Sequence, residues 1–333
     1  MPIVSSDLKA YKAAINNDSD ANGGTMSAVQ SVSGVAGNVL PPVSEAELAA
    51  GMNRYRKLFF KVANDDDLPL NNARAYIENY TPGDDRVLIF PGTQTDVQSD
   101  LAGTERLYGC GQLDATVTAG ATEIEVLMED GGDDAIQDGD TIRISDKTDI
   151  DDATGNEEEV VVSGAPTIAG DVYTITLATA LANGYAAAST RVASILSLGT
   201  LEGAYSGFAV TAAGDGAYDD TAHPVQLDSI GTIEDTFTLT FTDATSFDIT
   251  GLAAGDLGSG NISSATAPVN ATFGKPYWTL ASAGFSGTFA AGDTIQFTTD
   301  PAAAGIWYRH IVPAGAASLT ANKAVVVLDG ESA

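Results

Sequence analysis

Residues 235–243 read DTFTLTFTD and alternate strictly between apolar and polar side chains. Phe237, Leu239 and Phe241 fall on one side of this run, and threonines fall on the other. Successive side chains of a β-strand point to opposite faces, so a period of two predicts a strand with one buried face. This stretch therefore favours β-structure at its point in the chain.

Similar runs lie on both sides of this stretch, separated by turns that are rich in glycine and aspartate. They are EIEVLM (123–128), DTIRIS (140–145), EEEVVVSG (157–164), VYTITLAT (172–179), RVASILSL (191–198), AYSGFAVT (204–211), SFDITG (246–251), PYWTLAS (276–282) and DTIQFTT (293–299). Residues 253–270 are expected to form a long loop of small residues. Short strands at even spacing predict an all-β chain built of sandwich-like or barrel-like modules.

Strand-like segments also lie at the two ends of the chain. RYRKLFFKVAN (54–64), NARAYIENY (72–80) and RVLIF (86–90) precede the modules, and residues 306–331 follow as two strands around a Pro-Ala-Gly turn. AVVVL (324–328) is apolar throughout, as a central strand would be, but it has no partner nearby. We therefore expect a discontinuous sandwich of residues 51–106 and 301–333. It would be interrupted by a small β domain at 107–198 and a second β module at 199–300.

The first 50 residues show little core-forming periodicity. We expect residues 1–50 to form an extended arm that becomes ordered against a neighbouring molecule. Within it, SEAELAAGM (44–52) is either a short helix or a turn. Ser44 could cap such a helix, and Glu47 stands three residues later, as a capping box requires.

Charge excludes several classes of function. The chain has 333 residues with 45 acidic and 15 basic side chains, a net charge of −30. Such a surface repels phosphate, which argues against a nucleic-acid-binding protein and against a polybasic membrane patch. A hydrophobic content of 44% indicates a packed chain and not a disordered acidic tail. The acids concentrate in turns at 65–67, 130–140 and 146–159, which predicts a solvated rim.

No segment of the sequence has the features of a targeting or membrane-spanning element. The start, MPIVSSDLKAYK, lacks the apolar core of a signal peptide, and no run of 18 apolar residues occurs. The single cysteine, Cys110, excludes an intramolecular disulfide and a cysteine-based zinc site. We expect a protein that is made in a cytoplasm, with Cys110 as a small buried or turn residue.

The acidic turns are weak candidates for a Ca²⁺ site, since this cation prefers carboxylate and carbonyl oxygens. Asp18, Asp20 and Asn22 match the first half of an EF-hand loop, but Val29 stands where the bidentate glutamate is required. Asp138 and Asp140 are the other candidates. Aspartate and asparagine also make turns on their own account, and solvated turns are the plainer interpretation.

The residues required by known catalytic motifs do not occur together. GAYSG (203–207) has the wrong spacing for a nucleophile elbow, and only His223 and His310 could serve a triad. A glycosidase needs two carboxylates in a cleft, but among 45 carboxylates the sequence does not indicate which two would form such a pair. We therefore expect no enzyme, no catalytic residue and no resident cofactor.

One set of residues is a candidate for contacts in an assembly. The heavy apolar anchors and their basic neighbours either pack in the core or face outward as contacts: Arg54, Tyr55, Arg56, Phe59, Phe60, Trp307 and Tyr308. Since copies of so acidic a chain repel one another, we expect contacts at residues 54–61 and at the two termini.

Several stretches resemble virion structural proteins of tailed bacteriophages. They are GQLDATVTAGATEIEV (111–126), DGDTIRISDKTD (138–149), GNEEEVVVSG (155–164), TLATALANGY (176–185), IWYRHIVPAGAASL (306–319) and VVVLDGESA (325–333). The start, SSDLKAYKA (5–13) with GMNRYRKLFFKVAN (51–64) and ARAYIENYTPG (73–83), is similar to shorter phage proteins that join directly to an IVPAGA-type ending. The resemblance implies a structural role in the tail tip or baseplate, with the middle blocks as insertions.

We therefore expect a virion component that is assembled in the host cytoplasm. It would contact other virion proteins and copies of itself in a ring or trimer. A capsid decoration protein is one alternative. A receptor- or glycan-binding module, in which exposed Trp or Tyr stacks on sugar, is another.

Overall fold

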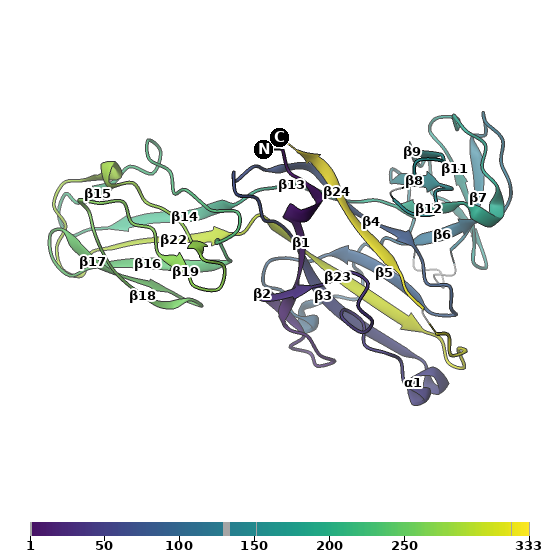
Figure 1. The fold of residues 1–333 in the computed structure, drawn as a ribbon, viewed down its shortest axis with the longest axis horizontal. Coiled ribbons are helices and arrows are strands. Elements are labelled where there is room, and N and C mark those ends of the chain that lie inside the picture. Colours follow the sequence, from purple (N-terminus) through teal and green to yellow (C-terminus); the bar gives the residue numbers. More distant parts are fainter. Residues whose placement is uncertain (1, 129–133, 151, 321, 333) are drawn as a thin grey trace.

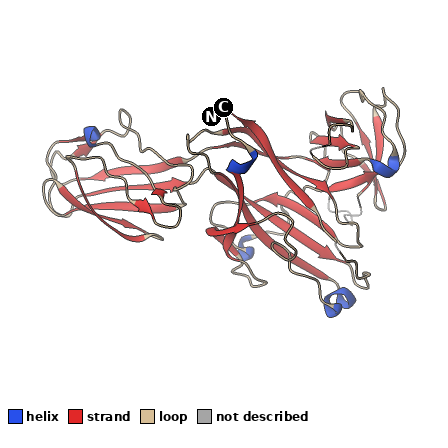
Figure 2. Ribbon diagram, in the orientation of Figure 1, coloured by secondary structure: helices blue, strands red, loops and turns tan. Residues whose placement is uncertain are grey.

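The computed structural model describes residues 2–128, 134–150, 152–320 and 322–332. Figure 2 shows that strands make up nearly all of its regular structure. Among these residues there is one α-helix, α1 (Glu45–Ala50), together with four 3-10 turns at Ser5–Asp7, Gln98–Asp100, Ala187–Ser189 and Ser282–Gly284. All strand pairs are antiparallel, and no sheet of the described residues closes into a barrel. The all-β prediction is confirmed.

A two-sheet sandwich forms the centre of the molecule (Figure 1). The larger sheet has the order β2-β1-β3-β23-β5, and the smaller has the order β13-β4-β24. Their bounds are β1 Leu8–Ile15, β2 Gly23–Ser31, β3 Met52–Val62, β4 Leu70–Asn79, β5 Arg86–Pro91, β13 Leu196–Leu201, β23 Ala303–Val312 and β24 Val325–Ser332. Because β23 lies between β3 and β5, the two ends of the chain build one sandwich.

The core of the sandwich follows the alternation of its strands. Leu58 and Phe60 of β3 point towards the smaller sheet, where they join Tyr76, Ile77 and residues of β5, β13, β23 and β24. The intervening residues of β3 point to the opposite face of the larger sheet. A residue of this strand therefore faces either the sandwich core or the loops and domains packed behind it.

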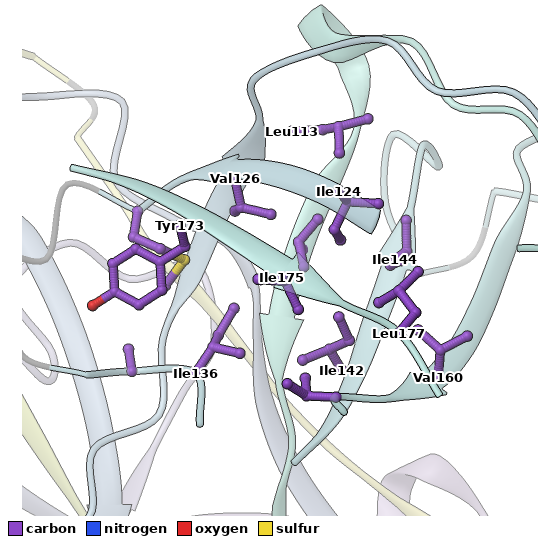
Figure 3. Packing of buried hydrophobic residues seen from close by; sticks show 14 of the residues in the cluster. Leu113, Ile124, Val126, Ile136, Ile142, Ile144, Val160, Tyr173, Ile175 and Leu177 are labelled. Carbon is purple, nitrogen blue, oxygen red and sulfur yellow. The ribbon is translucent and has the colours of Figure 1, made fainter. Parts of the chain in front are cut away.

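The first insertion folds as a seven-stranded sheet with the order β10-β11-β7-β6-β12-β8-β9. Its strands are β6 Cys110–Leu113, β7 Glu123–Leu127, β8 Thr141–Ser145, β9 Glu157–Val161, β10 Thr167–Ala169, β11 Val172–Thr176 and β12 Arg191–Ser194. Figure 3 shows its core of branched aliphatic side chains, with the Tyr173 ring at one side of the group. Leu88, Phe90 and Trp307 of the central sandwich belong to the same cluster, so this domain has no separate core.

The second insertion lies on the opposite side of the sandwich (Figure 1). Its main sheet has the order β14-β22-β16-β17-β18, and its core is rich in aromatic rings, with Trp278 fully buried. The bounds are β14 Ala204–Thr211, β15 Ala217–Tyr218, β16 Asp235–Phe241, β17 Ser246–Gly251, β18 Gly255–Asn261, β19 Val269–Asn270, β20 Lys275–Pro276, β21 Phe285–Ser286 and β22 Thr294–Asp300. The opening run of the sequence analysis is β16, with Phe237, Leu239 and Phe241 buried.

Four segments differ from the sequence-based expectations. Residues 1–50 are not a detached arm, because β1 pairs with β3 and β2 pairs with β1. Residues 191–198 are not one strand, since the chain leaves the first insertion after β12 and enters the smaller sheet as β13. The segment 276–282 is not one strand, because only Thr279 and Leu280 form isolated bridges beyond the end of β20, whereas the expected loop at 253–270 contains the strand β18.

The chain thus forms an elongated body with three lobes, and its two ends lie next to each other at the central lobe (Figure 1). Ile3 donates a backbone hydrogen bond to the Ser332 hydroxyl at 2.8 Å. No helix within the described ranges is long and apolar enough to cross a membrane.

Candidate interaction surface

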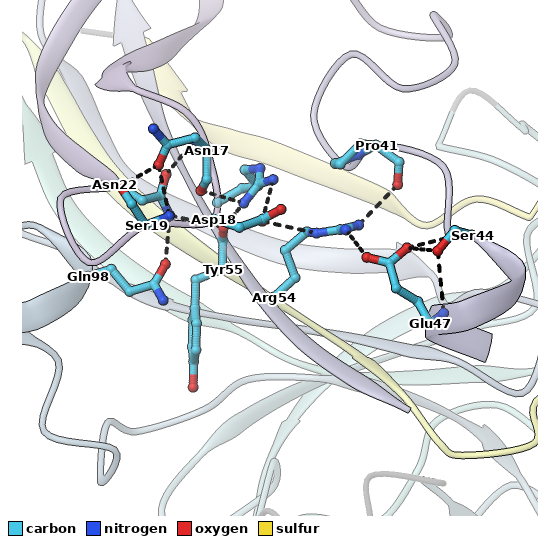
Figure 4. Close-up of polar contacts among 11 residues, drawn as sticks. Asn17, Asp18, Ser19, Asn22, Pro41, Ser44, Glu47, Arg54, Tyr55 and Gln98 are labelled. Atoms are coloured by element: carbon cyan, nitrogen blue, oxygen red, sulfur yellow. Dashed lines mark hydrogen bonds and ion pairs between the residues drawn. The ribbon is translucent and has the colours of Figure 1, made fainter. Parts of the chain in front are cut away.

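Two buried arginines of β3 organise the N-terminal hairpin and the chain that follows it (Figure 4). The Arg54 Nε lies 3.1 Å from an Asp18 carboxylate oxygen, and its other nitrogens bind the Glu47 carboxylate and the Pro41 carbonyl. The Arg56 guanidinium lies 2.7 Å from Asp18. The two arginines therefore hold the β1–β2 turn and the start of α1 on one strand.

The capping box predicted at Ser44 is present. The Ser44 hydroxyl accepts a hydrogen bond from the Glu47 N–H at 3.3 Å, and the Glu47 carboxylate accepts one from the Ser44 N–H at 2.7 Å. These bonds satisfy amide donors that the first turn of a helix leaves free. The Glu47 carboxylate is shared with Arg54, so the cap also ties α1 to β3.

The predicted calcium residues of the β1–β2 turn have other partners. Asp18 is 62% exposed but paired with both arginines; burial raises its pKa, and the hydrogen bonds and charges of Arg56 and Arg54 outweigh this and lower it. Asn22 is fully buried, and its amide donates to the Tyr55 carbonyl at 3.0 Å and to the Gln98 side chain at 3.1 Å. Asp20 is exposed, and its carbonyl accepts from the Ser99 N–H.

The acidic turns of the first insertion are likewise structural where they are described. Asp138 accepts a hydrogen bond from the Gly164 N–H at 2.6 Å, and Asp140 pairs with Arg106 and accepts from the Gln137 N–H. Asp130, Asp133 and Asp151 lie outside the described residues. In the described part of the chain, no three His, Cys, Asp or Glu side chains are grouped as a metal site would require.

Of the two alternatives for these residues of β3 and β23, core packing holds for nearly the whole set, and their assignment as outward-facing contacts is wrong. Arg54, Arg56, Phe59, Phe60, Trp307 and Tyr308 are all buried, and Tyr55 is half-buried with its ring 6.2 Å from that of Phe90. The reason is topological, because β23 and β3 are the second and third strands from the β5 edge of a covered sheet. The candidate residues of these two strands therefore offer little surface to another molecule.

A buried polar centre that sequence reasoning missed lies behind β3. The Lys57 ammonium lies 2.6 Å from an Asp96 carboxylate oxygen and donates to the Gly24 carbonyl at 2.9 Å. The Trp307 indole N–H donates to the other Asp96 oxygen at 2.7 Å. Burial lowers the pKa of Lys57. This centre fixes the loop after β5 and the start of β2 against the central sheet.

Lys61 joins the sandwich to the second insertion. Its ammonium is fully buried and donates to the carbonyls of Ile230 at 2.6 Å and Thr232 at 3.2 Å. Burial lowers the pKa of Lys61 to about 8. Next to it, the Ser229 hydroxyl donates to the Asn64 carbonyl at 2.6 Å. These bonds span the junction between the two parts of the chain.

An equivalent contact joins the sandwich to the first insertion. Arg143 of β8 pairs with Glu78 of β4 and with Glu157 of β9, and its guanidinium lies 5.0 Å from the centre of the Tyr76 ring. Glu78 is buried, which raises its pKa. Arg74 of β4 reaches across the same junction to Glu159 at 2.7 Å. One sequence signal for such contacts is a lysine or arginine within an otherwise apolar strand.

Two clefts of similar size open along this junction. One, of about 440 Å³, is lined mainly by charged groups that include Arg74, Arg143, Glu157 and Asp329. The other, of about 410 Å³, is lined by residues 79–83, Gln112 and residues 188–191, with no carboxylate among them. The Tyr80 hydroxyl donates to Gln112 at 2.7 Å beside the second cleft.

The residues considered for catalysis are separate from one another. His310 is buried, with its Nε2 2.6 Å from Asp85, and this pair holds the β4–β5 turn together with Asn322. Burial raises the pKa of Asp85. Hydrogen bonds from His310 and Asn322 and the charge of His310 have the larger effect, so the pKa of Asp85 lies below its ordinary value. Cys110 is buried at the start of β6.

Comparison of the chain with family models, with curated proteins and with solved structures finds no match in any of the three.

Proposed function

We propose that this chain is a structural component of a tailed-phage virion that acts through protein–protein contacts in the tail tip or baseplate. The observation that carries the proposal is the fixing of two inserted β domains to one sandwich by buried basic side chains. Lys61 of the sandwich binds carbonyls of the second insertion, and Arg143 of the first insertion binds Glu78 of the sandwich. The role is one of assembly, with no catalytic step.

These contacts suit a subunit that meets several neighbours at once. Association costs free energy when surfaces must first be ordered, and a preorganised body avoids that cost. The folded protein is strongly destabilised when a buried arginine or lysine loses its partner. Each insertion is therefore held in the one position in which the buried cation keeps its partners. The three lobes therefore present their surfaces in a fixed arrangement.

The internal use of cations also shapes the outer surface. Five of the 15 basic side chains are buried: Arg54, Arg56, Lys57, Lys61 and Arg143. These five cations are therefore not available to a neighbouring molecule, and the exposed charges are mostly acidic. Such a surface favours neighbours with basic faces and keeps free subunits soluble until they assemble.

The placement in the tail rests on the resemblance of the quoted stretches to tailed-phage virion proteins. The test is a cryo-EM map of purified particles, with antibody labelling against the chain. Density for a three-lobed β protein at the tail tip supports the proposal, and loss of the gene should give particles without complete tips. Density on the capsid would assign the decoration role instead, and absence of the chain from particles would refute both.

The carboxylate-free cleft favours glycan binding as a second candidate function. Gln112, Arg191 and Tyr80 are among its lining residues, and amide, hydroxyl and aromatic groups are those that hold neutral or acidic sugars. Binding of the isolated chain to host surface glycans, abolished by Gln112→Ala but not by substitution of Leu252 in the second insertion, would support this function. A glycan screen without binding would remove it.

A further inference from the structure

We propose that residues 21–44, the uncharged segment, form the surface through which copies of this chain contact one another. This inference rests on the proposed assembly function and names the partner of that function. The segment comprises β2 and the loop that leads to the helix cap at Ser44.

The uncharged segment is the longest stretch of the chain that contains no Asp, Glu, Lys, Arg or His. Between Asp20 and Glu45, every side chain is apolar, amide, hydroxyl or glycine. In a chain with a net charge of −30, most surfaces of one copy repel the same surfaces of another. Electrostatic repulsion between two copies is therefore smallest where they meet through this segment.

Exposed apolar side chains are concentrated in the same segment. Val29, Val32 and Val35 are each 57% exposed, and three of the 11 large exposed hydrophobic residues in the described part of the chain lie within these seven positions. Exposed apolar groups that cluster in this way are typical of contact sites.

The segment is held in one conformation before any partner arrives. The Asn38 amide donates to the Val32 carbonyl at 2.9 Å, and the Asn38 N–H donates to the Val35 carbonyl at 3.3 Å, which closes the loop on itself. Val39 and Leu40 pack against the sandwich core. Little conformational entropy is therefore lost when the loop is buried.

Two of the acids near the ends of the segment, Asp18 and Glu47, are paired with buried arginines. Asp18 pairs with Arg54 and Arg56, and Glu47 pairs with Arg54 (Figure 4). The buried arginines thus offset two of the negative charges that lie near the segment. They contribute to the contact by removing repulsion and not by touching a partner.

We expect two copies to meet through the side chains of the segment and not by adding a strand to the β2 edge of the sheet. β2 is the edge strand of its sheet, but its pairing with β1 is broken by a bulge between Met26 and Gln30. There the Ser27 hydroxyl donates to the Lys12 carbonyl and accepts from the Val29 N–H. A bulge of this kind interrupts the regular edge that a further strand would need.

A second copy is the occupant that these observations favour. A foreign partner with a basic face would be drawn to the acidic surfaces, whereas the uncharged apolar segment offers it no charge to pair with. An identical segment matches it in both polarity and absence of charge. Because charges elsewhere on the two copies still repel, added salt should strengthen the contact.

The test compares two charge-matched triple variants of the full chain. Val29→Glu, Val32→Glu and Val35→Glu together alter the segment, and Ile168→Glu, Leu252→Glu and Val269→Glu place the same charges on other exposed apolar positions. Sedimentation velocity over a range of concentrations and salt measures self-association. The segment variant should raise the dissociation constant at least about tenfold, and the control should leave it near the wild-type value.

A cysteine cross-link keeps the test independent of the triple variants. Because Cys110 is buried, Val32→Cys provides a single accessible thiol. Mild oxidation should give a covalent dimer of Val32→Cys but not of Leu252→Cys, which is 87% exposed in the native chain. A wild-type monomer at all concentrations, equal weakening by both triple variants, or equal cross-linking of both cysteines would each overturn the inference.

Failure of this inference is distinguishable from failure of the proposed function. If the chain is found in particles but its copies do not meet through the segment, only the inference fails. If copies associate through the segment but the chain is absent from particles, the virion role fails and the contact stands.

Discussion

Replacement of Lys61 by methionine should remove a pH-dependent term from the stability of the protein. The Lys61 ammonium is buried against the carbonyls of Ile230 and Thr232, and burial lowers its pKa to about 8 from an ordinary value of 10.5. Below pH 8 the lysine is protonated in both the folded and the unfolded chain. Between pH 8 and 10.5 the folded chain binds fewer protons than the unfolded chain. The free energy of unfolding should therefore rise with pH.

The size of this term follows from the difference between the two pKa values. About 2.5 pKa units correspond to about 3 kcal/mol, of which about 2 kcal/mol should develop between pH 7 and 9.5. The range ends at pH 9.5 because tyrosines of the unfolded chain begin to ionise near pH 10. Buried Tyr308, whose pKa is raised by burial, would then contribute a term of opposite sign.

The measurement is urea unfolding at constant ionic strength, followed by tryptophan fluorescence, for wild type and Lys61→Met. The quantity of interest is the difference in free energy of unfolding between the two proteins as a function of pH, since other titrating groups cancel in it. Lost hydrogen bonds to the two carbonyls add an offset that does not vary with pH. Lys275→Met is the matched control, because Lys275 joins the same two parts of the chain through an exposed pair with Asp65.

Wild type should gain about 2 kcal/mol relative to Lys61→Met over this range. The control should run parallel to wild type. Parallel curves for wild type and Lys61→Met would show that the ammonium is hydrated, and the described junction with the second insertion would then be wrong.

Three further predictions concern the interior. Phe59→Ala removes a fully buried ring and should lower the free energy of unfolding by about 3–5 kcal/mol in urea titrations; a loss below about 1 kcal/mol would place the ring at the surface. Arg143→Met leaves the buried Glu78 without its cation and should cost about 3–5 kcal/mol, part of which Arg143→Met with Glu78→Gln should recover; a double variant no more stable than the single one would contradict the pairing. Burial raises the pKa of the Cys110 thiol to about 12, so a chromogenic disulfide reagent should label it only in urea, and fast labelling of the native protein would contradict its burial.

The strands of the core could be predicted because each carries its own apolar alternation. β16 is an example, since Phe237 and Leu239 face the core of the second insertion whatever their neighbours are. Pairing between distant strands was harder to predict, because the apolar sequence AVVVL (324–328) does not indicate which strand it pairs with. Only the lack of a nearby partner indicated that this strand returns to the first part of the chain.

The hairpin β1–β2 could not be predicted because little of its stability comes from its own side chains. Only Tyr11 and Ala13 of β1 are buried, and β2 faces solvent over much of its length. The hairpin exists through backbone pairing with β3, which pattern reasoning does not detect.

The basic residues of β3 were misplaced for a related reason. Charged side chains inside a strand predict an exposed face, and burial becomes tolerable only when partners arrive from elsewhere. The partners of Lys57 and Lys61 are Asp96 and the Ile230 and Thr232 carbonyls, which lie in loops far along the chain. Arg54 and Arg56, which were predicted to contact another molecule, are likewise buried, through their pairs with Asp18 and Glu47.

The position of the insertions has a consequence for the order of folding. Met52 of β3 pairs with Val312 of β23, so the central sheet closes across most of the chain. Each insertion, however, starts and ends at neighbouring residues: Cys110 pairs with Ala193, and Ala204 pairs with Asp300. Once an insertion has folded, it replaces a long flexible loop by a short rigid link, which lowers the entropy cost of bringing β3 and β23 together. During synthesis the second insertion, whose core lies within residues 205–297, can therefore become structured first, and the central sandwich is completed only when β23 and β24 have left the ribosome.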